Sequence, residues 1–173
     1  PPLSSTTVFT NHAGAIIATG NSNAELTKVA SYMNLSHVEN GSTILNYVFA
    51  GEPYTFKYQL SEQVFKPVKG DSTEMARFQL RNMNFNYNDT ATFTVTVENL
   101  GRDTKTTKFT GRILGQANNI LGLAPIVDTG GFKVGVQSQA KNTKITLTND
   151  THLPSLFQSV EWEGFVNLRN QRL

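Results

Sequence analysis

Two glutamates flank the single tryptophan of the chain, and they are the pair whose type and spacing best fit catalysis. They are Glu161 and Glu163, on either side of Trp162. On a β-strand, residues two apart point to the same face and lie about 6.5–7 Å apart. Two carboxylates so placed beside an aromatic ring could act as the acid and base of a glycosidase. The same spacing is common on a solvated strand face. We favour that second interpretation, so we predict no catalytic residue.

The histidines do not have the spacing of metal ligands. His12, His37 and His152 each lack a second histidine or a carboxylate at a ligand spacing. Asp150 and His152 would share a face on a strand, but a surface turn explains this pair better. The sequence also holds neither a Gly-x-Ser-x-Gly elbow nor a glycine-rich phosphate loop. We therefore predict no metal site, no cofactor and no enzyme activity.

Four basic residues gather within a short segment: Arg102, Lys105, Lys108 and Arg112, with Asp103 among them. On a strand, Lys108 and Arg112 would share a face and Lys105 would lie on the other. Such a group could contact nucleic-acid phosphates, or it could cover a solvated hairpin, and we favour the hairpin.

The segment Tyr54-Thr55-Phe56-Lys57-Tyr58 alternates aromatic and polar residues. Exposed aromatic rings in a row can stack on sugars, whereas buried ones form a core strand. We favour the core strand, which predicts that replacing Tyr58 by Ala destabilises the fold.

The composition limits the class of protein. The chain has 173 residues, no cysteine, 15 Lys plus Arg and 13 Asp plus Glu, giving a net charge of +2. Apolar residues make up 38% of the chain, which is too many for a disordered chain. No run approaches the roughly 20 apolar residues of a membrane span. The weak charge argues against a protein devoted to nucleic acids, and the Pro-Pro start suggests a fragment of a longer chain.

Apolar residues alternate with polar ones along most of the chain, which is typical of half-buried antiparallel strands. The alternating sets include Phe93/Val95/Val97, Phe132/Val134/Val136, Ile145/Leu147 and Val160/Trp162/Val166/Leu168. The alternation changes parity in one segment. Phe78 and Leu80 are at even positions, whereas Met83, Phe85 and Tyr87 are at odd positions. This change indicates either a β-bulge near Arg81-Asn82 or two short strands.

The first fifty residues have a different pattern. Residues 1–20 are expected to form an extended arm or linker, and residues 21–50 a helix and a first strand. The helix is expected after Ser22, because Ser22 and Glu25 have capping-box spacing and Leu26, Val29, Ala30 and Met33 follow on one face. The predicted fold is all-β, with residues 51–173 forming an antiparallel sandwich- or barrel-like domain. About eight to ten strands are expected, with a short N-terminal helix.

Several short stretches, in order, carry a resemblance to a known family. They are 51–56 (GEPYTF), 61–62 (SE), 77–84 (RFQLRNMN), 109–112 (FTGR), 114–115 (LG), 119–122 (NILG), 152–155 (HLPS) and 159–165 (SVEWEGF), followed by the basic residues Arg169 and Arg172. From about Gly51 onward, the chain resembles the C-terminal region of the tail tubular protein B, or nozzle protein, family of T7-like short-tailed bacteriophages.

The resemblance implies a structural function and supplies no catalytic residues. In that family the protein forms a six-fold ring below the adaptor, closes the tail tip around the DNA channel and carries surfaces for fibre attachment. The implied partners are copies of the chain itself, adaptor and fibre proteins, and DNA in passage. The implied location is the virion tail, assembled in the bacterial cytoplasm. The alternative is a carbohydrate- or receptor-binding β-module of a phage fibre.

Overall fold

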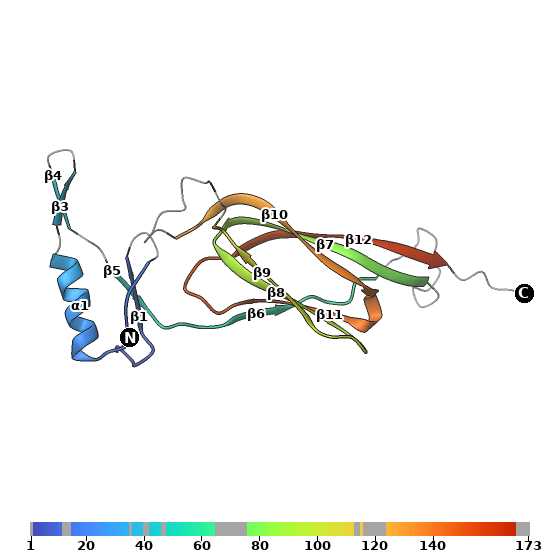
Figure 1. Cartoon of the computed structure of the whole chain (residues 1–173), viewed down its shortest axis with the longest axis horizontal. Coiled ribbons are helices and arrows are strands. Elements are labelled where there is room, and N and C mark those ends of the chain that lie inside the picture. Colours follow the sequence, from blue (N-terminus) through green and yellow to red (C-terminus); the bar gives the residue numbers. More distant parts are fainter. Residues whose placement is uncertain are drawn as a thin grey trace, which may run out of the picture.

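The structure is a computed structural model that describes residues 2–11, 15–34, 36–39, 42–45, 48–64, 76–112, 115 and 124–168. Its described residues form twelve strands, one α-helix and a short 3-10 helix. Figure 1 shows an elongated molecule with the N-terminal elements at one end and a larger β-sandwich at the other.

The sandwich consists of two antiparallel sheets. One has the order β10-β7-β12, from β7 (Ala76–Thr90), β10 (Val127–Gln139) and β12 (Leu156–Leu168). The other has the order β6-β11-β8-β9, from β6 (Phe56–Gln59), β8 (Thr92–Asn99), β9 (Lys105–Thr110) and β11 (Thr143–Asn149). The 3-10 helix Ala140–Asn142 connects β10 to β11. Neither sheet closes on itself, so the structure selects the sandwich over the barrel.

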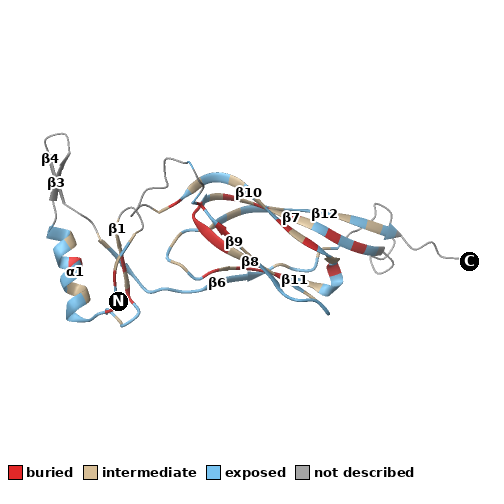
Figure 2. Ribbon diagram, in the orientation of Figure 1, coloured by how far each residue is buried: buried red, intermediate tan, exposed pale blue. Residues whose placement is uncertain are grey.

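The core lies between the two sheets, and the alternating residues of the sequence fill it. Buried positions recur every second residue along the long strands (Figure 2). Phe93 on β8 is the centre of an aromatic cluster, with its ring centroid 4.9 Å from those of Phe109 and Phe157 and 5.5 Å from that of Phe132. Because these four rings come from both sheets, their packing holds the sheets face to face.

Strand β7 is continuous and contains a bulge at Arg81. Asn82 pairs with Glu163 of β12, and Leu80 pairs with the next residue, Gly164, so Arg81 is the extra residue. The extra residue restores the parity, so that both apolar sets face the core. The buried apolar residues of β7 are Phe78, Leu80, Met83, Phe85 and Tyr87. The bulge is thus confirmed, and the alternative of two short strands is wrong.

The neighbouring strand β10 is irregular at the same level. Gly135 pairs with Asn82 and Ser138 pairs with Leu80, which leaves two residues of β10 opposite the single Arg81. One of them, Gln137, has a φ of 52°. Both partners of the central strand therefore change register at one point, and the sheet bends there.

The first twenty residues contain two strands rather than only an arm. Strand β1 (Val8–Asn11) pairs with β2 (Ile16–Thr19) and with β5 (Val48–Gly51) in a three-stranded antiparallel sheet. Phe9 and Ala18 of this sheet are buried with Val29 in a second, small core. The sequence suggested an extended arm or linker over residues 1–20. It did not reveal these paired strands, because each is only four residues long and too short to show a period.

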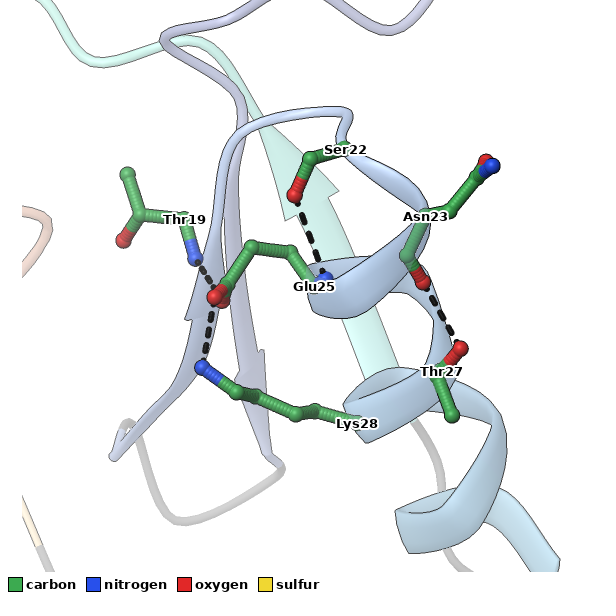
Figure 3. A network of polar contacts seen from close by, with 6 residues as sticks. All are labelled: Thr19, Ser22, Asn23, Glu25, Thr27 and Lys28. Carbon is green, nitrogen blue, oxygen red and sulfur yellow. Dashed lines mark hydrogen bonds and ion pairs between the residues drawn. The ribbon is translucent and has the colours of Figure 1, made fainter.

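The predicted helix is present as α1 (Asn23–Asn34). The amide of Glu25 donates to Ser22 Oγ at 3.3 Å, which is the cap that the spacing predicted (Figure 3). The Glu25 carboxylate does not complete a capping box; it accepts from the amide of Thr19 and from Lys28 Nζ. Of the predicted apolar face, Leu26 and Val29 pack on the sheet, whereas Ala30 and Met33 are exposed.

A second hairpin follows the helix, formed by β3 (Ser36–Glu39) and β4 (Ser42–Leu45). Residues 21–50 thus hold a helix and three strands, where one strand was expected. These N-terminal strands bring the total above the predicted eight to ten. The glycines and proline of residues 115–125 favour a loop with a short strand, and residues 116–123 of this stretch lie outside the described part of the chain. The division of the chain into separate units at residue 51 stays a prediction.

Candidate functional site: the surfaces of the sandwich

The two candidate catalytic glutamates lie on the outer, solvent-facing side of the β10-β7-β12 sheet. Glu163 accepts from Asn82 Nδ2 at 3.1 Å, and Glu161 accepts from Asn86 Nδ2 at 3.0 Å. The hydrogen bond from Asn82, together with Lys133 Nζ at 3.6 Å, holds the pKa of Glu163 below its usual range. A general acid needs a raised pKa, so this arrangement favours the solvated-face interpretation.

A column of asparagines surrounds these glutamates. Residues 82, 84, 86 and 88 of β7 are all asparagine and lie on the outer face, where Asn82 pairs with Glu163 and Asn84 with Glu161 of β12. Asn84 donates to Asn86 at 2.8 Å, and both side chains lie over Gly131 of β10, where a Cβ atom would approach them to 2.9 Å. The outer face of this sheet is therefore an amide surface whose polar groups largely satisfy one another.

The histidines do not form a metal site with other described residues. Asp150 and His152 lie in the exposed turn between β11 and β12, as predicted. His37 belongs to β3, and His12 lies outside the described residues. In the described part of the chain, no group of three or more His, Asp or Glu side chains could hold a metal ion. The described residues likewise contain no helix that is long and apolar enough to span a membrane.

The four basic residues divide into two pairs. Arg102 Nη1 donates to the carbonyl of Gln137 at 3.2 Å, and Lys105 Nζ donates to that of Gly135 at 3.4 Å. These bonds connect the β8–β9 hairpin to the bulge of β10 in the facing sheet. Lys108 and Arg112 are exposed instead, and Lys108 lies on the face opposite Lys105, as the sequence predicted.

The edge strands β6 and β12 lie at the other side of the sandwich from the edge strands β9 and β10, and they carry exposed apolar side chains. We call this side of the sandwich the β6–β12 side. Stacking of Phe56 on Phe157 at 6.3 Å places these two edge strands together. The exposed residues there, with their exposed fractions, are Tyr58 (54%), Leu156 (54%), Trp162 (43%) and Phe165 (60%). Among the described residues, β12 pairs only with β7 and β6 only with β11, so each presents an edge.

This exposure corrects the prediction of a buried aromatic strand at residues 54–58. Phe56 packs against the core, but Tyr54 is 77% exposed and Tyr58 is more than half exposed. The alternation correctly identified β6 as a strand. It could not show that β6 is a four-residue edge strand in which Tyr58 is exposed.

Sequence reasoning also missed the exposure of Trp162 and Phe165. Trp162 has the parity of the core, and its ring lies edge-on to that of Phe78 with the centroids 4.9 Å apart, yet it is 43% exposed. Phe165 points to the outer face, where the Arg81 guanidinium lies 5.7 Å from its ring centroid. The available signal in the sequence was Gly164, which lies between Trp162 and Phe165. A glycine inside a strand often marks a bulge or a place where another part of the chain comes close.

A pocket of about 360 Å³ lies between the N-terminal sheet and the turn that holds His152. Its lining includes the exposed rings of Phe49 and Tyr54, together with Pro154. Asn149, also in the lining, donates to Leu153 O and Ser155 Oγ and accepts from Thr151. Its amide is therefore used to shape the turn.

Comparison with known proteins agrees with these structural features. The sequence matches the bacteriophage nozzle protein family over residues 3–173. The match includes the first fifty residues, which the resemblance noted from sequence did not cover. No curated protein matches the chain. The chain therefore belongs to the bacteriophage nozzle protein family, whose members are structural components of the phage tail.

Proposed function

We propose that this chain forms part of a ring, a hexamer by the family resemblance, around the DNA ejection channel at the tail tip. Neighbouring copies would meet through the β6–β12 side. The observation that carries the proposal is the outer edge of β12, a strand of 13 residues that has no described strand beside it and exposes aromatic rings. Such an edge is a template for pairing with another chain.

The charges favour a head-to-tail contact between copies. Strand β12 carries two glutamates and no basic residue, whereas the hairpin of residues 98–112 carries four basic residues against two acidic ones. If β12 paired with a second β12 about Trp162, Glu161 would face Glu163 of the other copy, and like charges opposite one another destabilise a sheet. A contact between the acidic and the basic side avoids this, and heterologous contacts close into rings.

The remaining parts of the proposal concern the neighbours of the ring. Adaptor and fibre proteins would bind above and beside it, and DNA would pass through it. Assembly would take place in the bacterial cytoplasm before the tail joins the virion.

A charge-swap series tests the contact between copies. We expect Glu161→Lys/Glu163→Lys to weaken self-association, and Lys108→Glu/Arg112→Glu to weaken it as well. All four side chains are exposed, so each substitution should change the free energy of unfolding by less than about 0.5 kcal/mol. Combining the two sets should restore association, measured by sedimentation velocity at several salt concentrations. Asp150→Lys, in the exposed turn that precedes β12, is the control for a charge change outside the two strands.

The same series separates an interface from a channel wall. If Lys108 and Arg112 contact a neighbouring copy, Glu161→Lys and Glu163→Lys on β12 should restore the self-association that Lys108→Glu and Arg112→Glu weaken. If they line the channel instead, the reversal alters DNA ejection by assembled phage and no rescue occurs. Association that none of the variants changes would contradict the proposed contact.

The second candidate function, binding of a carbohydrate receptor, is favoured by the pocket beside Tyr54. An exposed aromatic ring next to polar groups can stack on a sugar. Screening the chain against glycans would test this. Saturable binding by a monomer, lost in Tyr54→Ala but kept in Tyr58→Ala, would support this candidate over the ring. Tyr58 is the matched control because it is also exposed but does not line the pocket.

A further inference from the structure

A second pocket, of about 340 Å³, lies where the bulges of β7 and β10 meet the turn between β8 and β9. Its lining brings together side chains from four separate elements: Gln79, Leu80 and Arg81 of β7, Arg102 of the turn, Gln137 of β10 and Phe165 of β12. Two of these side chains are always cationic, and none is a carboxylate. The charge of the pocket therefore favours an anion.

Arg81 is held in position but is not neutralised by an ion pair. Its guanidinium lies 5.7 Å from the ring centroid of Phe165, and among the described residues it forms no salt bridge or side-chain hydrogen bond. The charge of Arg81 contributes to the lowered pKa of the Glu163 carboxyl on β12, but the groups that bind this carboxylate are Asn82 and Lys133. Stacking on the ring restricts the guanidinium at little cost to its hydrogen-bonding capacity.

Arg102 is positioned by the bulge on the other side of the pocket. Its Nη1 donates to the carbonyl of Gln137, a residue whose φ of 52° is unusual for a side chain other than glycine. That bond uses one of the five guanidinium N–H donors. The remaining donors, like those of Arg81, have the geometry that binds phosphate oxygens in pairs.

We propose that this pocket binds a phosphate group of a nucleic-acid backbone, held between Arg81 and Arg102. A backbone phosphate suits the site better than a carboxylate, because two guanidiniums can bind separate oxygens of one phosphodiester. The amides of Gln79 and Gln137 add neutral donors at the rim. The inference rests on the proposed channel function in one respect, the choice of DNA as the polyanion. The pocket itself is formed within a single chain.

Binding of a fluorescent DNA duplex to the purified chain, measured by anisotropy at low salt, tests the proposal. We expect Arg81→Ala and Arg102→Ala each to raise Kd by about threefold to tenfold and to lower the salt-dependence slope by about one. Phe165→Leu should raise Kd without changing that slope, because it removes the ring that positions Arg81 and leaves the charge. Arg77→Ala is the matched control: Arg77 is also exposed on β7 but does not line the pocket.

Three outcomes would overturn the proposal. They are equal Kd values for Arg81→Ala, Arg102→Ala and Arg77→Ala, a wild-type chain that does not bind the duplex, and binding of a carboxylate-rich peptide in preference to it. Sedimentation velocity of the same variants distinguishes a failure of the phosphate site from a failure of the proposed ring. Pocket-dependent binding by a monomer would support the site and contradict the ring, whereas a ring that binds DNA equally in all variants would contradict only the site.

Discussion

Gly164 of β12 lies against the ring of Phe78, so closely that a Cβ atom on residue 164 would be 2.7 Å from a ring carbon. The same atom would be 2.4 Å from the backbone oxygen of Gln79. Phe78 is buried and supports Trp162 edge-on, so the missing side chain at residue 164 allows the core to reach the end of the sandwich. The bulge at Arg81 creates this close approach, because it places Gly164 opposite Leu80.

This contact predicts that Gly164→Ala destabilises the sandwich. The backbone oxygen cannot move without breaking the register of β7, so the cost should be that of overpacking, about 1–3 kcal/mol. For a chain of this size, that corresponds to a fall in Tm of roughly 2–12 °C. Thermal unfolding followed by circular dichroism measures it. Gly51→Ala, where a Cβ would meet nothing within 4 Å, should leave Tm nearly unchanged. Equal Tm values for both variants would show that the register yields at residue 164.

The N-terminal cap of α1, which Figure 3 shows, gives a second prediction. Ser22→Ala removes the oxygen that accepts from the Glu25 amide, and loss of such a cap costs about 1 kcal/mol. Because Leu26 and Val29 are the residues through which α1 packs on the described N-terminal sheet, the loss should appear as faster hydrogen exchange of the helix. Ser31→Ala, at an exposed position inside α1, should slow exchange instead, because alanine favours helix more than serine does. Unchanged exchange in Ser22→Ala would mean that the cap does not stabilise the helix.

The turn at residues 4–7 is tied to Glu52 in a way that predicts a pH dependence. The Glu52 carboxylate accepts from the hydroxyls of Thr7, Thr6 and Ser4, and these bonds, led by the one from Thr7, lower its pKa. A group with a lowered pKa in the folded state stabilises it above the unfolded pKa of about 4.3, and this contribution is lost as pH falls through the folded value.

Titration by NMR measures this effect. The Glu52 carboxyl should titrate below about 4.3, and the amides of Thr6 and Thr7 should shift with the same midpoint. In Glu52→Gln those amides should show no such transition, because the neutral amide does not titrate. A Glu52 midpoint at or above about 4.3 in the wild type would contradict the hydroxyl contacts.

Much of the sandwich was predictable because its core follows the strand period. Phe93, Val95 and Val97 all pair with β9, and Val95 and Val97 also pair with β11. All three are buried on the face of β8 that their alternation indicated. The change of parity between Phe78 and Phe85 allowed either a bulge near Arg81 or two short strands, and the sequence alone did not decide between them. The helix was legible from Ser22 and the apolar spacing that follows it.

The edges of the sheets were not predictable, because strand order depends on pairing between distant residues. Alternation assigns Tyr58 and Trp162 to the core face, but it does not tell whether the facing sheet extends over them. The bonds from Arg102 and Lys105 to β10 lie 35 and 30 residues away in sequence and depend on the bulge at Gln137. The candidate surfaces are formed by these long-range relationships, so they could be found only in the folded chain.

Native mass spectrometry of the purified chain, beside a denaturing intact-mass spectrum, tests the ring most directly. If copies associate through the β6–β12 side, the native spectrum should contain a closed oligomer at a whole-number multiple of 19.1 kDa, which dissociates when Glu161 and Glu163 are replaced by Lys. The denaturing spectrum should give only the single-chain mass. A native spectrum that holds only the 19.1 kDa monomer at micromolar concentrations would contradict the ring.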